Sequence, residues 1–187
     1  QALRQRMHQL LRALPAKYRA DASQRIAGQV LSNMENSDNT TTGLFLSRHD
    51  EVDTGPLLET WKAQGRPLAI PAWDQTEKAY RWAKLPARNE LVLDPFGILH
   101  PANPTWLPAQ ILATILVPGL AFDPQGWRLG RGGGHFDQLL LGTSGMRIGL
   151  GFVFQCVDEI PRNPWDIPLN LFVHDKATLG PWPTPQI

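Results

Sequence analysis

Hydrophobic positions follow two different periods along the 187-residue chain. From Leu3 to Leu14 they recur every three or four residues and share one face, which predicts an amphipathic helix ending at Pro15. A second helical pattern runs from Ala22 to Leu31. The polar run Asn36–Thr42 breaks this pattern and predicts an exposed loop. Beyond it, apolar residues come in short continuous runs, so we expect helices first and a sheet afterwards.

Four of these short runs are the best candidates for strands. Continuous apolar segments of this length suit a sheet that is covered on both faces. They are Gly43–Ser47, Pro67–Pro71, Ala113–Pro118 and Arg147–Phe152. Helices are predicted between some of them, at Pro56–Gln64 and at Phe136–Leu141, whereas the proline-rich segments Pro95–Pro108 and Pro161–Pro168 predict ordered surface loops.

This alternation predicts an α/β fold. We expect three layers, α/β/α, around a mainly parallel sheet. The length favours a single domain over residues 1–187. In such sheets ligands usually bind beyond the carboxyl ends of the strands, which is where we expect a functional site.

Composition and charge exclude several classes of function. The 18 Lys and Arg residues nearly balance the 17 Asp and Glu residues, and a net charge of +1 does not favour nucleic acid or any other general polyanion as a partner. Cys156 is the only cysteine, so an internal disulfide or a Cys-rich zinc site is excluded. No apolar run approaches the ~20 residues of a membrane span. We expect a cytoplasmic protein whose anion sites, if any, are local.

One such local cluster lies between residues 117 and 137, after a predicted strand and before a predicted helix. Gly130, Gly132, Gly133 and Gly134 allow a close approach of backbone N–H groups to an anion. Arg128 and Arg131 add two guanidinium groups that can each grip phosphate oxygens. The spacing fits neither a P-loop nor a dinucleotide fingerprint. We predict a polyphosphate site, with a plain flexible turn as the alternative.

Asp137 follows this cluster directly. A carboxylate would repel phosphate unless a cation lay between them, so Asp137 is a candidate Mg²⁺ ligand. The alternative is an acid in the first turn of a helix, where it interacts favourably with the helix dipole.

The segment as a whole resembles the signature of the 5-formyltetrahydrofolate cyclo-ligase family. The likeness rests on Val117–Asp123, on Gly126–Gly134 and on the pair Phe136-Asp137. Further similar segments follow the same order along nearly the whole chain. They are Leu3-Arg4, Leu46–Thr54, Ala69–Pro71, Phe96–Pro101 and Trp165–Leu169.

The resemblance implies a fold of the sugar-phosphate isomerase and CoA-transferase type and an ATP- and Mg²⁺-dependent reaction. We expect the protein to be a monomer. ATP would phosphorylate the formyl oxygen of 5-formyltetrahydrofolate, and attack by N10 would then close the ring to 5,10-methenyltetrahydrofolate with release of phosphate. Such chemistry needs positioning and charge neutralisation more than a covalent nucleophile.

The same likeness implies roles for individual residues. ATP would be held by Arg4, Arg128, Leu129, Gly130, Arg131, Gly132, Gly133, Gly134, His135 and Phe136, with Arg128 and Arg131 catalytic. Mg²⁺ would be held by Asp137 and Asp166, and the folate by Leu46, Glu51, Phe96, His135 and Phe136. Taken without the family, Arg4 is a solvated helix residue, Glu51 a cap before the next helix and Asp166 a turn cap.

The pair His135-Phe136 departs from the family, which usually has an aromatic residue followed by tyrosine at these positions. The resemblance implies that a hydroxyl group is missing at Phe136. An alternative hypothesis is therefore a catalytically weak member that binds folate or nucleotide in a storage or regulatory role. His135 is open to two interpretations, a general base or a neutral hydrogen-bonding group in the turn.

Overall fold

The structure is a computed structural model that describes residues 1–34, 40–87 and 90–182. The chain begins with helices α1 (Ala2–Arg12) and α2 (Ala16–Asn33), separated at Pro15 as predicted. Proline has no N–H and cannot continue a helix, but it suits the position that precedes a new one. The later helices α3 (Gly55–Ala63) and α4 (His135–Leu140) also lie where the sequence predicts them.

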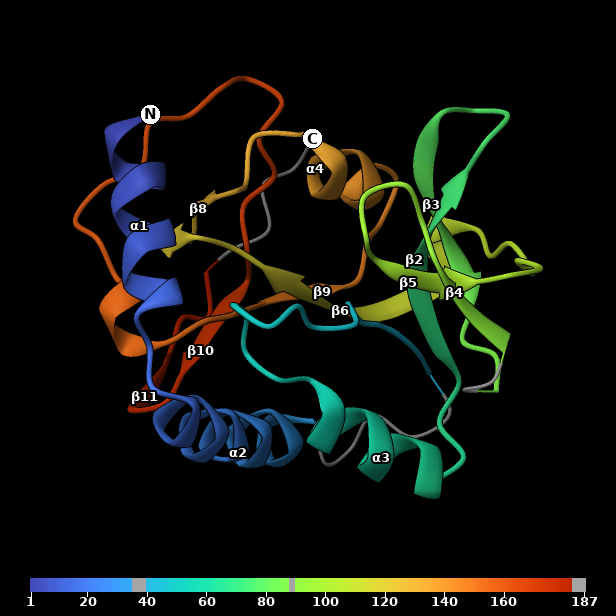
Figure 1. Cartoon of the computed structure of the whole chain (residues 1–187), viewed down its shortest axis with the longest axis horizontal. Coiled ribbons are helices and arrows are strands. Elements are labelled where there is room, and N and C mark those ends of the chain that lie inside the picture. Colours follow the sequence, from blue (N-terminus) through green and yellow to red (C-terminus); the bar gives the residue numbers. More distant parts are fainter. Residues whose placement is uncertain (35–39, 88–89, 183–187) are drawn as a thin grey trace.

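The described strands form one seven-stranded sheet and two short two-stranded sheets. The large sheet has the order β11-β10-β9-β6-β1-β2-β3 (Figure 1). Its strands are β1 (Thr41–Gly43), β2 (Leu68–Asp74), β3 (Ala79–Lys84), β6 (Leu112–Pro118), β9 (Met146–Leu150), β10 (Leu171–His174) and β11 (Ala177–Leu179). The five inner strands are parallel, and only the edge strands β3 and β11 are antiparallel to their neighbours. The mainly parallel sheet is thus confirmed.

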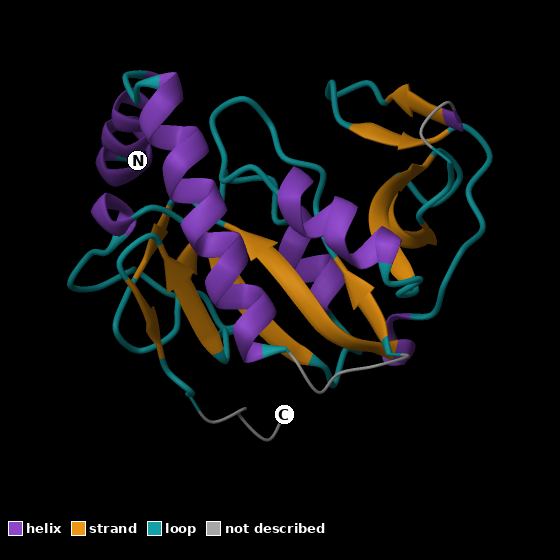
Figure 2. Ribbon diagram, turned by 90° about the horizontal axis from the view of Figure 1, so that it is seen from below, coloured by secondary structure: helices purple, strands orange, loops and turns teal. Residues whose placement is uncertain are grey.

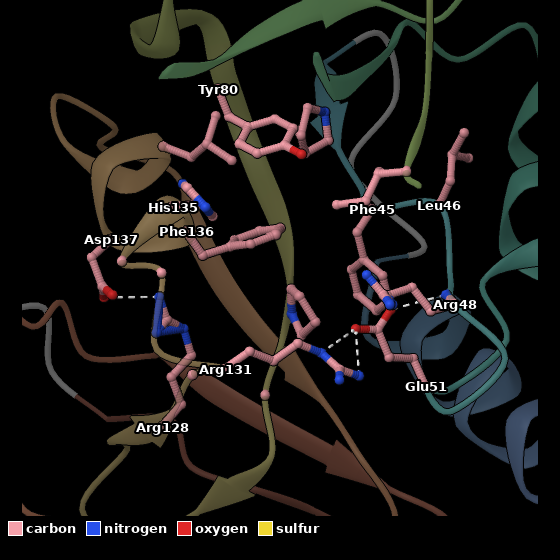
Figure 3. A pocket seen from close by; sticks show the side chains of 18 of the residues that line it. Phe45, Leu46, Arg48, Glu51, Tyr80, Arg128, Arg131, His135, Phe136 and Asp137 are labelled. Carbon is pink, nitrogen blue, oxygen red and sulfur yellow. Dashed lines mark hydrogen bonds and ion pairs between the residues drawn. The ribbon is translucent and has the colours of Figure 1, made fainter. Parts of the chain in front are cut away.

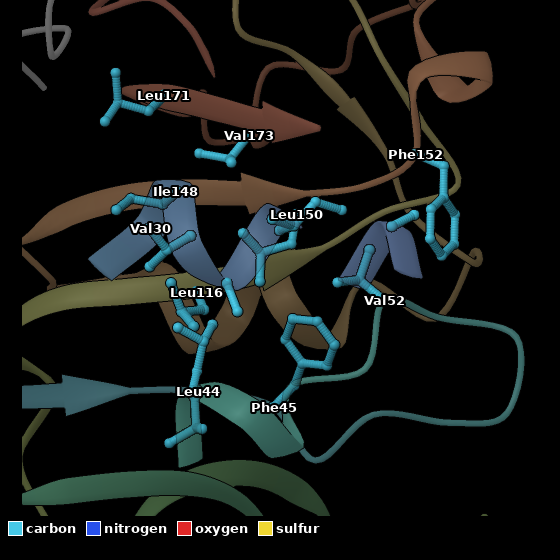
Figure 4. Close-up of a cluster of buried hydrophobic side chains, with 14 of the residues drawn as sticks. Val30, Leu44, Phe45, Val52, Leu116, Ile148, Leu150, Phe152, Leu171 and Val173 are labelled. Carbon is cyan, nitrogen blue, oxygen red and sulfur yellow. The ribbon is translucent and has the colours of Figure 1, made fainter. Parts of the chain in front are cut away.

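The sheet is covered on both faces. Helices α1, α2 and α3 bury side chains such as Met7, Val30 and Trp61 against one face (Figures 1 and 2). Helix α4 buries Leu139 and Leu140 against the other. Along β6 the buried side chains alternate, with Leu116 in the first cluster (Figure 4) and its neighbours Ile115 and Val117 in the second. The predicted three-layer α/β/α architecture is therefore confirmed.

The first strand departs from its predicted position. Strand β1 occupies Thr41–Gly43 rather than Gly43–Ser47, and Thr42 is fully buried opposite Leu68 and Thr114. The prediction of a loop over Asn36–Thr42 is wrong for Thr41 and Thr42, which belong to β1. Threonine is β-branched and therefore fits a buried strand despite its polarity. Residues 36–39 of that loop lie outside the described residues.

The hydrophobic pattern did not predict several of the shorter strands. Strands β3, β10 and β11 were not predicted, and the expected proline-rich loop contains β5 (Leu99–Pro101), which pairs with β4 (Leu91–Leu93). Charged and polar residues interrupt β3, and β10 is only four residues long. The remaining elements are β7 (Ala121–Phe122), β8 (Arg128–Leu129) and the 3-10 helices Ala109–Ile111 and Val153–Gln155.

Candidate active site

A pocket lies beyond the carboxyl ends of the central parallel strands, as expected for this class of fold. Phe45 and Leu46 line it shortly after β1, and Pro118 and Gly119 line it at the end of β6. The empty volume, including the open mouth, is about 900 Å³.

The glycine segment forms one side of this pocket. After β6 the chain makes a tight hairpin in which β7 pairs with β8. Asp123 holds the hairpin, since its Oδ1 accepts hydrogen bonds from the backbone N–H groups of Gln125 and Trp127 at 2.9 and 3.0 Å. Strand β8 places Arg128 at the pocket, and the glycines then lead into α4, whose N-cap residue is Gly134 in the left-handed conformation.

Arg128 is a buried cation at the pocket wall. Only 3% of its side chain is exposed, and its Nη2 donates to Asp137 Oδ1 at 2.8 Å (Figure 3). Burial lowers the pKa of Arg128, while the charges of Asp137 and Asp166 act in the opposite direction. Within the described part of the chain, the buried Nε has no hydrogen-bond partner. An unsatisfied guanidinium donor in such a place is suited to an incoming anion.

Arg131 reaches across the pocket to the loop that follows β1. Its Nη2 lies 2.8 Å from Asp50 Oδ1. Its Nε donates to Glu51 Oε1 at 3.2 Å, as Figure 3 shows. Burial alone would raise the pKa of Asp50, but the hydrogen bond and charge of Arg131 outweigh it and hold that pKa below its usual value. Burial raises the pKa of Glu51, against opposing contributions from the Arg48 N–H and Arg131. Arg131 thus connects the glycine turn to the loop after β1.

A cluster of four rings lies beside the pocket, and we call it the aromatic wall; two of its members, Tyr80 and His135, line the pocket. It consists of Trp73, Tyr80, Phe96 and His135. The centroid of the His135 ring lies 5.0 Å from the centroid of the Tyr80 ring and 5.9 Å from that of Phe96. The Phe96 ring packs edge-on against Trp73, with a centroid distance of 5.1 Å. A Cβ on Gly133 would lie 2.7 Å from the His135 ring, so the glycine makes room for the histidine. Flat ligands pack well against such surfaces.

Most residues singled out from the sequence come together here. Those that line the pocket are Leu46, Glu51, Arg128, Gly130, Arg131, Gly133, Gly134, His135, Phe136 and Asp137. Arg4 does not line the pocket, but its Nε donates to the Gly130 carbonyl at 3.0 Å. Arg4 therefore supports the glycine turn and is not merely a solvated helix residue. Phe96 belongs to the aromatic wall but is 50% exposed.

The remaining predicted residues have other contacts. Leu129 is buried in β8, and Gly132 lies on the exposed side of the glycine turn. Asp166 Oδ2 accepts the backbone N–H of Asn163 at 2.7 Å, which is the turn-capping role considered as the alternative, yet its charge also acts on Arg128. Among the described residues no group of three or more His, Cys, Asp or Glu side chains is arranged to hold a metal ion.

Sequence reasoning missed several residues that line the pocket, and others that contact its lining residues. Phe45 and Arg48 lie in the loop 44–51, within or beside segments already noted. Asp50 is adjacent to Glu51, and its pairing with Arg131, 81 positions away, depends on the tertiary fold. Trp73 and Tyr80 lie on the β2–β3 hairpin, where aromatic and charged residues alternate and no ligand signal is evident.

The fold and the pocket are those of an α/β protein in which a glycine turn and two arginines lie beside a wall of aromatic rings. Comparisons with known proteins specify the class. The profile of the 5-formyltetrahydrofolate cyclo-ligase family matches residues 1–175, and the chain belongs to this family. It is accordingly a ligase of folate and one-carbon metabolism. Over the described residues, no helix is both long and apolar enough to cross a membrane.

Individual relatives agree with this assignment. The 5-formyltetrahydrofolate cyclo-ligase of Escherichia coli (strain K12) is 29% identical over 174 residues, which covers 89% of this chain and 95% of that protein. The Mus musculus enzyme of the same name is 30% identical, with 94% and 93% covered. The NMR structure of Aquifex aeolicus 5,10-methenyltetrahydrofolate synthetase superposes with a TM-score of 0.86 at 26% identity, covering 100% of this chain and 94% of that one.

Proposed function

We propose that this protein converts 5-formyltetrahydrofolate into 5,10-methenyltetrahydrofolate at the expense of ATP in the presence of Mg²⁺. The observation that carries the proposal is one pocket in which Arg128, Arg131 and the glycine turn lie beside the aromatic wall. The names of the relatives describe the substrate and the product of this same step. The pocket therefore combines a site for phosphate groups with a site for a flat ring.

The phosphate half of the site is the glycine turn. Gly130, Gly133 and Gly134 line the pocket, so backbone N–H groups can approach phosphate oxygens without interference from side chains. Arg128 and Arg131 would neutralise the charge that develops during phosphoryl transfer. Their carboxylate partners hold the guanidinium groups in place before the nucleotide binds.

The charge balance favours a nucleotide that arrives as its magnesium complex. Three carboxylates, Asp50, Glu51 and Asp137, already pair with the two arginines, so these five side chains leave no surplus of positive charge for the phosphates. Mg²⁺ on phosphates typically uses only one or two protein carboxylates and keeps several waters. Asp137 at the pocket wall and Asp166 near Arg128 fit this requirement, and they would hold the ion that neutralises phosphate charge.

The folate half of the site lies between the aromatic wall and the loop after β1. The pterin ring of folate is flat and can pack against the rings of Tyr80 and His135. Glu51 lines the same space, and its carboxylate can accept hydrogen bonds from pterin N–H groups. Leu46 and Phe45 supply apolar contacts.

The reaction then proceeds in two balanced steps. The formyl oxygen attacks the γ-phosphorus, the bond between that phosphorus and the β-bridging oxygen breaks, and ADP leaves. The N10 lone pair next attacks the activated carbon, the carbon–oxygen bond breaks, inorganic phosphate leaves and N10 loses its proton. Arg128 and Arg131 would neutralise the negative charge on the phosphate oxygens in both steps.

A direct assay tests this proposal. Purified protein with 5-formyltetrahydrofolate, ATP and Mg²⁺ should give the ultraviolet absorbance of the methenyl product, together with equal amounts of ADP. Omission of ATP, or chelation of Mg²⁺, should abolish the signal. Tight binding of folate or ATP with no product under any of these conditions would exclude the enzymatic function and favour a storage or regulatory binder.

The missing hydroxyl at Phe136 allows a gain-of-function prediction. Phe136 lines the pocket with its ring edge-on to Phe45 at 6.5 Å. Because one well-placed donor can contribute a few kcal/mol in a transition state, Phe136→Tyr should raise kcat by roughly tenfold with little change in KM. Phe136→Leu is the control that alters the ring without adding a hydroxyl. An unchanged kcat in Phe136→Tyr would show that the reaction does not need a hydroxyl here.

A further inference from the structure

A buried aspartate, Asp94, forms hydrogen bonds with two residues of the aromatic wall, Tyr80 and Phe96. Asp94 follows β4, is only 6% exposed and does not line the pocket itself. Its Oδ1 accepts hydrogen bonds from the backbone N–H groups of Phe96 and Ile98, both at 2.8 Å. Its Oδ2 accepts the hydroxyl proton of Tyr80. One carboxylate therefore joins strand β3 to the turn between β4 and β5.

These hydrogen bonds determine where two pocket surfaces lie. Tyr80 carries the ring that contacts His135, and Phe96 contributes a second ring of the aromatic wall. Ile98, held by the same carboxylate, lines the pocket together with Leu99. A backbone hydrogen bond from Asp94 N–H to the Ile98 carbonyl at 2.9 Å closes the turn. Movement of Asp94 would displace rings and aliphatic side chains at once.

Several apolar side chains of the hairpin are largely exposed. Leu93 and Phe96 are 67% and 50% exposed, and Leu99 is 43% exposed. Burial of apolar area therefore contributes less to the position of the turn than it does in the core. The three hydrogen bonds to a buried carboxylate are the stronger constraint, since bonds to an ionised acceptor are worth more than neutral ones.

We propose that Asp94 is a positioning residue for the folate ring, acting through Tyr80 and Phe96. The inference rests on the proposed function, because it concerns the folate half of the same pocket. The Tyr80 hydroxyl is a hydrogen-bond donor to Asp94 and serves to orient its own ring, so it is not a proton donor to the substrate. Burial and the Asp94 carboxylate raise the pKa of Tyr80, which keeps this donor protonated.

The chain contains a matched pair for a control. Asp175 is also buried, and it accepts the hydroxyl of Tyr18 and the backbone N–H of Val153, each at 2.8 Å. Neither Tyr18 nor Asp175 lines the pocket. Substitutions of this pair report the general cost of disrupting a buried tyrosine–aspartate contact, without a change in the aromatic wall.

The experiment compares Asp94→Ala, Asp94→Asn and Tyr80→Phe with Asp175→Ala, Asp175→Asn and Tyr18→Phe. KM for 5-formyltetrahydrofolate and KM for ATP are measured for each, together with the melting temperature. Asp94→Ala should raise the folate KM roughly tenfold and leave the ATP KM within about twofold, because a displaced wall weakens ring packing only. Asp94→Asn keeps an oxygen for the two N–H groups and should recover most of the loss. The Asp175 and Tyr18 variants should lower the melting temperature without raising the folate KM.

Several outcomes would overturn the inference. They are an unchanged folate KM in Asp94→Ala, equal rises of both KM values, or the same folate effect in Asp175→Ala. If Asp94→Ala does not fold, Tyr80→Phe decides, because it removes only the hydroxyl and should still raise the folate KM severalfold. A wild-type protein that does not bind 5-formyltetrahydrofolate would instead refute the proposed function, and with it this inference.

Discussion

Replacement of Arg128 by alanine is expected to lower kcat/KM for ATP by on the order of a hundredfold or more. Arg128 is a buried cation at the pocket wall, paired with Asp137 and with its Nε unsatisfied within the described residues. Without it, Asp137 would present an uncompensated carboxylate to the phosphates. The folate KM should change far less, because the proposed folate site lies at the aromatic wall and not at Arg128. Steady-state kinetics with each substrate varied in turn provide the measurement.

Arg147 provides the control for this prediction. It is also buried, at 2% exposure, but lies on β9 away from the pocket, and burial lowers its pKa too. Arg147→Ala should reduce stability and leave both KM values nearly unchanged. Arg128→Lys should recover only part of the activity, because lysine keeps the charge but lacks the planar fork of donors. Equal losses for ATP and folate in Arg128→Ala, with the fold intact, would contradict the phosphate assignment.

The sequence predicted the part of the site that is local in the chain. Residues 128–137 lie consecutively between a strand and a helix, so their types and spacing already describe a phosphate-binding turn. The parallel sheet was predictable for a similar reason, since β2, β6 and β9 overlap the predicted apolar runs. The inner strand β10 was not predicted, and β1 begins earlier than predicted, because burial in the centre of the sheet overrides the polarity of threonine.

The partners of these residues depend on contacts between distant segments. Arg4 and Gly130 are 126 positions apart, and Arg131 and Asp50 are 81 apart. Neither contact can be predicted from the spacing of hydrophobic and polar residues along the sequence. Tyr80 and Asp94 are 14 positions apart, but Tyr80 lies on β3 and Asp94 lies in the turn after β4, so their hydrogen bond depends on how these two hairpins pack together. What sequence patterns could not supply is therefore the position of the folate half of the pocket.

The glycine turn gives the second large expected effect, through the conformation of Gly132. Its φ of +109° is one that residues with a Cβ rarely adopt, at a cost of about 1–3 kcal/mol. A Cβ at this position would meet no atom of the described residues within 4 Å, so the expected effect comes from the backbone and not from a clash. Gly132→Ala should therefore shift the turn and raise the KM for ATP by roughly tenfold to a hundredfold, measured at saturating folate.

Gly130→Ala separates this backbone effect from the close approach of a ligand. Gly130 has no positive φ and likewise has open space around its would-be Cβ, and its carbonyl keeps the hydrogen bond from Arg4 in the variant. The turn should thus survive in Gly130→Ala, and any rise in its ATP KM reports a phosphate that lies against the backbone. A Gly132→Ala protein with a wild-type ATP KM would show that the nucleotide does not depend on the shape of this turn, and the phosphate site would then have to lie elsewhere in the pocket.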